Sequence, residues 1–364
     1  MKKKTLALFF TYRNGLHTWQ EVGSISREVR PYQELAKYFN QVYFFTYGDK
    51  KEESKYSLPE NMRVFSKKWR MPSVLYSFLL PFVYRKELKE IDIIKTNQMS
   101  GSWTALIAKW LYKKKMVLRC GYEWLNVMQK EKKPKWKRIL VRALSKTSYK
   151  YADRIVFTSQ KDKDYAERFF SIDLKKTTVI PNYIDIELFK PEDIIKTIDV
   201  IFVGRLAREK NLPNLIKAVN DLGASLVLVG EGPKEEGLRK TAGENVLFKG
   251  RIKNEELPKE LNKAKIIAMV SFYEGCPKAL LEGMSCGLAP LASNVEGIRE
   301  IVNEENGVLV GIEEQDLKEG LRQLLNNEKM RKELGKKARK TIEESFSLLS
   351  IIEKELKLYI GLYA

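Results

Sequence analysis

Histidine and cysteine are scarce in this chain of 364 residues, which contains one histidine, His17, and three cysteines. Cys120, Cys276 and Cys286 show no paired spacing of the kind that marks a zinc site or a disulfide framework. We therefore expect reduced thiols in a cytoplasmic protein. Because imidazole and thiolate ligands are few and clustered aspartates are missing from the candidate site described below, the sequence predicts no bound metal.

Long apolar runs are also missing, so no segment is long enough to span a bilayer. The apolar residues 6–10 follow three lysines and could be mistaken for a signal peptide, but the run is short and lacks a small-residue cleavage site. We interpret it as the first β-strand. With 44% hydrophobic and 31% charged residues, the composition fits a globular protein, and the length allows two domains with a full core each.

Acidic residues are scarce in one half of the chain only. Over residues 1–180 there are 38 Lys and Arg against 17 Asp and Glu, whereas residues 181–364 contain 28 against 30. The net charge of +19 therefore comes from the first half. This asymmetry predicts an anionic partner for that half, which could be a membrane surface, a lipid-linked phosphate or a nucleic acid.

The second half repeats one pattern, in which an apolar strand ends in a turn and a helix follows. The four strands are expected at 200–203, 226–229, 245–250 and 266–270. Strands that alternate with helices form a parallel sheet, and such sheets bind ligands at the carboxyl ends of their strands. In the first half, we expect 154–158 to be the last strand.

Two glutamates eight positions apart, Glu274 and Glu282, bracket a Gly-Pro turn and the helix start that follows it. The free N–H groups and the dipole of a helix start favour phosphate. A carboxylate can accept two hydrogen bonds from a vicinal diol, so a glutamate at each end suits the hexose and the ribose of a nucleotide sugar. Arg205 and Lys210 follow the strand 200–203, where they could clamp a pyrophosphate. Glutamates at this spacing are also common on helix surfaces.

In combination, several segments resemble the GT4-type glycosyltransferases. These segments are the Glu274/Glu282 pair, Gly204-Arg205 with Lys210, residues 181–185 and residues 229–233. The resemblance covers residues 150–345 well and the first half loosely. It implies an α/β fold with two facing Rossmann-like domains (GT-B), parallel sheets and a ligand cleft between the domains.

The resemblance also implies a domain organisation. Residues 1–180 would form an acceptor-binding Rossmann-like domain, which the charge count makes the basic one. Residues 181–345 would form the domain that binds the nucleotide sugar. Residues 346–364 would form a helix that packs back on the first domain.

The activity implied by the resemblance is a retaining, metal-independent hexosyl transfer. The donor would be a UDP- or GDP-linked sugar, the acceptor a glycan or lipid-linked saccharide, and no cofactor would be needed. In the family, the residue matching Glu274 contacts the transferred sugar, the one matching Glu282 contacts the ribose, and those matching Arg205 and Lys210 contact the pyrophosphate. The further residues expected to bind the donor are Gly204, Gly275, Cys276, Pro277, Lys278, Ala279, Leu280, Arg251, Ile252 and Asn182.

The acceptor side departs from the family pattern. Many members carry a histidine after a first-domain strand, but the corresponding stretch 118–124 has none, and Arg119, Tyr122 or Glu123 could take its place. His17 instead follows the first strand, in a glycine-containing loop where backbone could approach a phosphate or acceptor. Ordinary loop geometry explains the same glycines. The acceptor-side candidates are Gly15, His17, Gly23, Arg119 and Tyr122.

Segments 69–86 and 130–150 interleave Trp and Leu with Lys and Arg. This composition suits an interfacial element on anionic lipid, although a solvated helix face would show it too. We expect a cytoplasmic protein that is peripheral at the inner face of the cell membrane.

Two other functions stay open at this point. A nucleotide-sugar epimerase could use the same fold, because a fold does not determine a function. A nucleic-acid-binding protein would explain the charge, but it leaves Glu274 and Glu282 unexplained, so we expect no nucleic-acid partner.

Overall fold

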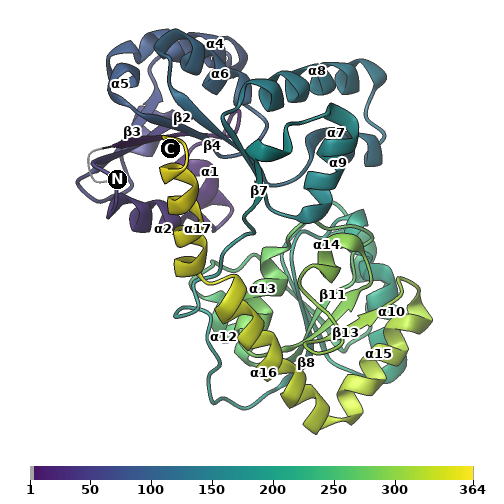
Figure 1. Ribbon diagram of the computed structural model, residues 1–364. Coiled ribbons are helices and arrows are strands. Elements are labelled where there is room, and N and C mark those ends of the chain that lie inside the picture. Colours follow the sequence, from purple (N-terminus) through teal and green to yellow (C-terminus); the bar gives the residue numbers. More distant parts are fainter. Residues whose placement is uncertain (1–3, 364) are drawn as a thin grey trace. The chain divides into compact units, whose positions relative to one another are not determined.

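The computed structural model describes residues 4–363, and the chain divides into two compact units. Unit 1 combines the described residues up to Ile180 with those from Ile352 onward, whereas unit 2 runs from Pro181 to Ile351. Each unit is an α/β structure built on one parallel sheet, as the sequence predicts (Figure 1). No helix in the described part of the chain combines the length and the hydropathy that a membrane span requires.

The sheet of unit 1 has seven strands in the order β3-β2-β1-β4-β5-β6-β7. Its central strands are buried, so they appear in the sequence as nearly continuous apolar runs, and the N-terminal run forms β1. The prediction that 154–158 is the last strand is wrong, because β7 follows and pairs with β6. With only three residues, β7 is too short to show a period in the sequence. The strands are β1 Thr5–Phe9, β2 Gln41–Asp49, β3 Met62–Lys67, β4 Ile93–Thr96, β5 Lys115–Cys120, β6 Arg154–Phe157 and β7 Thr177–Val179.

Helices connect these parallel strands and cover the sheet of unit 1 (Figure 1). The last helix, α17, belongs to this unit from Ile352 onward. Its Glu355 carboxylate accepts hydrogen bonds from Lys95 Nζ at 2.7 Å, and both residues are buried. This pair anchors α17 to strand β4. The helices are α1 Leu16–Glu21, α2 Ile25–Ala36, α3 Lys50–Glu53, α4 Ser73–Val83, α5 Arg85–Glu90, α6 Ser102–Tyr112, α7 Trp124–Lys130, α8 Lys135–Tyr151, α9 Gln160–Phe170, η1 Leu174–Lys176 and α17 Leu348–Ile360.

The sheet of unit 2 has six strands in the order β10-β9-β8-β11-β12-β13. In both sheets the order reverses beside the first strand, between β1 and β4 and between β8 and β11. Ligands of open α/β sheets bind at this reversal, outside the carboxyl ends of the strands. The strands are β8 Ile198–Val203, β9 Leu226–Val229, β10 Val246–Gly250, β11 Ala264–Met269, β12 Ala289–Ser293 and β13 Val308–Val310.

Helices of unit 2 pack on both faces of its sheet. At the carboxyl edge of this sheet, the turns that contain Gly204 and Gly230 approach each other closely. Gly230 has φ of +131°, and a Cβ there would lie 2.0 Å from the carbonyl oxygen of Gly204. Only glycine permits this close approach. The helices are η2 Arg208–Lys210, α10 Leu212–Leu222, α11 Glu235–Thr241, α12 Leu257–Asn262, α13 Lys278–Ser285, α14 Glu296–Arg299, α15 Glu314–Asn326 and α16 Glu328–Ser345.

Candidate functional site

The carboxyl ends of β8 and β11 bring Lys210 and Glu274 together. Lys210 ends η2, shortly after β8, and Glu274 lies in the loop after β11. Lys210 Nζ is 2.5 Å from Glu274 Oε1, and the two side chains are only 16% and 12% exposed. Partial burial strengthens the attraction relative to a surface pair. The ion pair thus occupies the point where the strand order reverses.

Neighbouring residues hold the backbone and the carboxylate of Glu274. Ser271 Oγ donates to Glu274 Oε1 at 2.7 Å, and Ser293 Oγ donates to the carbonyl of Ser271 at 2.6 Å. On the other side, a Cβ on Gly297 would lie 2.3 Å from the carbonyl oxygen of Glu274. Sequence reasoning missed Ser271, although its place just beyond the end of β11 and three residues before Glu274 was a usable signal.

The residues after Glu274 lead into α13, which begins after Pro277. Asn182 Nδ2 donates to the carbonyl oxygen of Cys276 at 2.7 Å, so two segments expected to bind the donor are in contact. Leu280 is fully buried in the core, so its side chain serves packing. The half-buried residues of this turn and helix start are Gly275, Cys276, Lys278 and Ala279.

Glu282 lies on α13 and is only 1% exposed. Asn254 Nδ2 donates to its Oε1 at 3.0 Å, which connects α13 with the segment after β10. Asn254 is also buried, and no pattern in the sequence pointed to it. The contact of Glu282 with a ribose stays a prediction.

The remaining candidates of unit 2 lie along the same carboxyl edge. Arg205 directly follows Gly204, is exposed, and forms no ion pair with any described residue. Its guanidinium is therefore available to an anion. Arg251 Nε lies 3.0 Å from Glu231 Oε2, with both side chains about half exposed, and the adjacent Ile252 packs against the core.

In unit 1, His17 is bonded through both ring nitrogens. Its Nδ1 lies 2.9 Å from Glu53 Oε1, and its Nε2 lies 3.2 Å from Thr18 Oγ1. The buried Glu53 also accepts from the backbone N–H of Leu16, and a Cβ on Gly15 would lie 2.3 Å from its Oε1. Gly15 thus makes room for a carboxylate at the start of α1. Sequence reasoning missed Glu53 because no pattern connects residues 36 positions apart.

The other candidates of unit 1 are not gathered around His17 by any described contact. Gly23 has φ of +67° in the turn before α2, and Tyr122 is 39% exposed. Arg119 follows Leu118 in β5, and its charge helps to keep Glu355 ionised. Although burial opposes ionisation, the Lys95 ammonium and the Arg119 charge hold the pKa of Glu355 below its ordinary value.

Glu123 is a fully buried carboxyl next to these candidates. It precedes α7, and its Oε2 accepts the N–H of Asn126 at 2.7 Å. Burial raises the pKa of Glu123 to about 7, because the charged form loses its solvation.

Among the residues the structure describes, no three His, Cys, Asp or Glu side chains gather where they could hold a metal ion.

Two family models match adjoining parts of the chain. Residues 32–188 match the model described as Glycosyltransferase Family 4, and residues 185–341 match the model described as Glycosyl transferases group 1. Together the two matches run without a gap through most of both units.

Two relatives illustrate the sequence similarity. An uncharacterised glycosyltransferase of Methanocaldococcus jannaschii is 28% identical over 90% of this chain and 86% of its own. The GalNAc-α-(1→4)-GalNAc-α-(1→3)-diNAcBac-PP-undecaprenol α-1,4-N-acetyl-D-galactosaminyltransferase of Campylobacter jejuni is 31% identical over 60% of this chain. That alignment spans 62% of the Campylobacter protein, which is less than two thirds of its length.

Solved structures share the fold over nearly the whole chain. Sucrose-phosphate synthase of Thermosynechococcus elongatus has a TM-score of 0.82 at 20% identity and covers 99% of both chains. Anabaena HepE in complex with UDP has a TM-score of 0.76 at 17% identity and covers 98% of this chain and all of its own. At these identities the likeness is one of fold, and it confirms the predicted GT-B fold class.

Proposed function

The chain belongs to the GT4-like family of glycosyltransferases, and from this premise we propose that it moves a hexose from a nucleotide-diphosphate sugar to a glycan or lipid-linked saccharide. The observation that carries the proposal is the Lys210–Glu274 pair at the carboxyl ends of β8 and β11. The pair places a cation for a diphosphate beside a carboxylate for sugar hydroxyls.

The proposed reaction retains the configuration of the sugar. The acceptor hydroxyl attacks the anomeric carbon on the face from which the diphosphate departs, and a leaving phosphate oxygen takes the hydroxyl proton. Lys210, Arg205 and the start of α13 stabilise the negative charge that develops on the diphosphate. No step of this scheme requires a metal ion or a protein base.

The relatives support the substrate classes. HepE was solved with UDP, which supports a uridine nucleotide and leaves a GDP-linked donor open. The Campylobacter relative is named for an undecaprenol-diphosphate saccharide, which supports a lipid-linked acceptor. Acceptor contacts are proposed for the edge of unit 1 that carries Gly15 and His17, with Gly23, Arg119 and Tyr122 as the further candidates.

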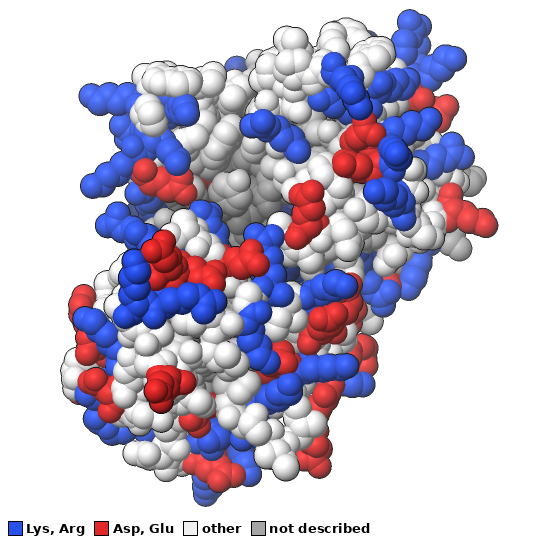
Figure 2. All heavy atoms as spheres, turned by 180° about the vertical axis from the view of Figure 1, so that it is seen from behind, with Lys and Arg blue, Asp and Glu red and all other residues white. Residues whose placement is uncertain are grey.

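An anionic membrane is the proposed second partner, which makes the protein a peripheral one at the cytoplasmic face. Figure 2 shows Lys and Arg outnumbering Asp and Glu over unit 1, whereas the two signs mix over unit 2. Helices α4 and α8 add exposed apolar side chains among these cations, which suits lipid contact. The exposed apolar residues of α4 and α8 include Val74, Leu75, Phe78, Leu79, Phe82, Trp136, Ile139 and Leu140.

The central experiment compares Glu274→Ala and Arg205→Ala with Glu236→Ala, a matched control whose exposed side chain lies on α11. Loss of one charged contact in the transition state costs roughly 2–4 kcal/mol, so transfer should fall about thirty- to several-hundred-fold. Near-normal transfer by both site variants would refute the site. Conversion of the donor sugar without any transfer would favour an epimerase instead.

A further inference from the structure

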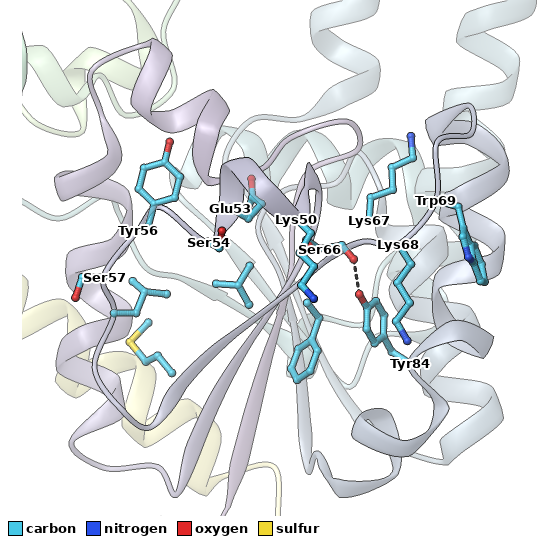
Figure 3. A pocket seen from close by; sticks show the side chains of 14 residues that line it. Lys50, Glu53, Ser54, Tyr56, Ser57, Ser66, Lys67, Lys68, Trp69 and Tyr84 are labelled. Atoms are coloured by element: carbon cyan, nitrogen blue, oxygen red, sulfur yellow. Dashed lines mark hydrogen bonds between the residues drawn. The ribbon is translucent and has the colours of Figure 1, made fainter.

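A groove of about 860 Å³ runs along β3 in unit 1 (Figure 3). The strand β3 is the edge strand of its sheet, and all the residues that line the groove belong to unit 1, whereas Lys210 and Glu274 belong to unit 2. Apolar side chains such as Met62 and Phe65 contribute to its wall, and Lys50 and Lys68 add cations. The groove therefore combines an apolar lining with positive charge.

Lys50 and Lys68 extend to the same side of the groove, one on each side of Tyr84 (Figure 3). Lys68 Nζ lies 4.6 Å from the centre of the Tyr84 ring, and the Tyr84 hydroxyl donates to the carbonyl oxygen of Ser66. Neither lysine forms an ion pair with any residue that the structure describes. Each ammonium group is therefore available to an anion.

Glu53 is the one carboxylate among the described residues that line the groove, and it is paired elsewhere. Glu53 contributes to the wall, but its side chain is 2% exposed and is engaged by His17 and by the N–H of Leu16. Figure 3 shows its carboxylate directed away from the two lysine nitrogens. The charge of the groove is therefore complementary to an anion such as a phosphate ester.

The chain leaves the groove at Trp69 and enters α4, whose outward side chains are apolar. Tyr76 of α4 donates to the carbonyl oxygen of Ser66 at 3.1 Å, so the helix is attached to the strand that lines the groove. The exposed fractions of the outward residues range from 41% to 55%. These residues are Val74, Leu75, Phe78, Leu79 and Phe82. A cationic groove joined to an exposed apolar helix matches a molecule with a phosphate head and hydrocarbon chains.

We propose that this groove binds the phosphate headgroup of an anionic membrane phospholipid, while the outward face of α4 contacts its acyl chains. The inference rests on the proposed membrane partner and specifies where one lipid molecule binds. Lys50 and Lys68 contact the phosphate, and Tyr84 keeps Lys68 in position through its ring.

The test measures flotation of the full chain with phosphatidylcholine vesicles that contain or lack phosphatidylglycerol. Lys50→Gln/Lys68→Gln should weaken binding to the anionic vesicles by at least about thirty-fold, because each substitution removes a direct charge-assisted contact with the phosphate. Lys51→Gln/Lys55→Gln removes the same charge from neighbouring positions outside the groove wall and should cost clearly less, because these side chains contribute only the salt-screened attraction of the surface. Equal losses in the two double variants would overturn the proposal, because diffuse attraction would then explain the binding.

Two further arms test the headgroup and the helix. Glycerophosphoglycerol, the water-soluble headgroup, should displace the wild type from anionic vesicles better than inorganic phosphate at equal charge. Phe78→Gln should weaken vesicle binding, whereas Phe169→Gln, at an exposed position on α9, should not. Competition by charge alone, or equal effects of the two Phe substitutions, would contradict a lipid site.

Failure here is distinguishable from failure of the proposed transfer. The groove variants should retain the thermal stabilisation that a nucleotide sugar confers on the wild type, because the donor residues lie in unit 2. If no nucleotide sugar stabilises the wild type, the donor proposal fails whatever the vesicles show. If Lys50→Gln/Lys68→Gln lowers the thermal stability of the protein without any ligand, the conservative Lys50→Arg/Lys68→Arg variant should restore both folding and vesicle binding. If the Arg variant folds but does not bind anionic vesicles, the lipid site is wrong.

Discussion

Burial of Glu123 should make the protein less stable as the pH rises. The folded pKa is about 7 because burial disfavours the charged form; the N–H of Asn126 opposes this shift and the Asp162 carboxyl adds to it. In the unfolded chain the pKa returns to the ordinary 4.5. Between these two values the folded protein holds more protons than the unfolded chain, so the free energy of unfolding falls as the pH rises through this window.

The magnitude follows from the two pKa values. Their difference, at about 1.4 kcal/mol for each pKa unit, corresponds to a penalty on the order of 3 kcal/mol above pH 7. Glu123→Gln removes the charge but keeps an acceptor for the N–H of Asn126. The variant should therefore match the wild type near pH 4.5 and exceed its free energy of unfolding by up to about 3 kcal/mol at pH 8.

Urea denaturation of both proteins at pH 5 and pH 8 measures this difference directly. Glu131→Gln is the matched control, because its exposed side chain lies at the other end of α7. A difference between Glu123→Gln and wild type that does not change with pH would refute the reasoning. So would a wild type that is the more stable protein at pH 8.

Three further predictions concern other parts of the chain. Breaking the buried Lys95–Glu355 pair by Glu355→Gln should lower the free energy of unfolding by roughly 3–5 kcal/mol. The double variant Lys95→Met/Glu355→Leu should recover most of this loss, because it leaves no unpaired charge buried. If urea denaturation gives the double variant a free energy of unfolding no higher than that of Glu355→Gln, the prediction is wrong. Gly297→Ala should lower the rate of sugar transfer, because its Cβ would lie 2.3 Å from the carbonyl oxygen of Glu274. The control Gly237→Ala, whose Cβ would have no neighbour within 4 Å, should leave the rate unchanged. Equal transfer rates in the two variants would argue against a role for the Gly297 contact. Transfer should persist in excess EDTA, and loss of activity that magnesium restores would disprove the metal-free scheme.

The sequence by itself determined the α/β class with parallel sheets, because buried parallel strands produce apolar runs and each run is followed by a recognisable turn. The GT-B arrangement of two such domains was implied by the family resemblance. It also placed Lys210 and Glu274 at one edge of a sheet, since each lies in the segment that follows a strand, and the structure sets them 2.5 Å apart. Their roles in binding a donor stay predictions. The contrast in charge between the halves required only counting.

Only the tertiary structure decided which distant side chains meet. Glu53 bonds His17, Asn254 bonds Glu282, and Glu355 bonds Lys95 across 260 positions. No periodicity records such pairs, because each depends on how separate elements pack and not on the local chain. The short edge strand β7 escaped prediction for a related reason: its pairing with β6, rather than its own three residues, makes it a strand.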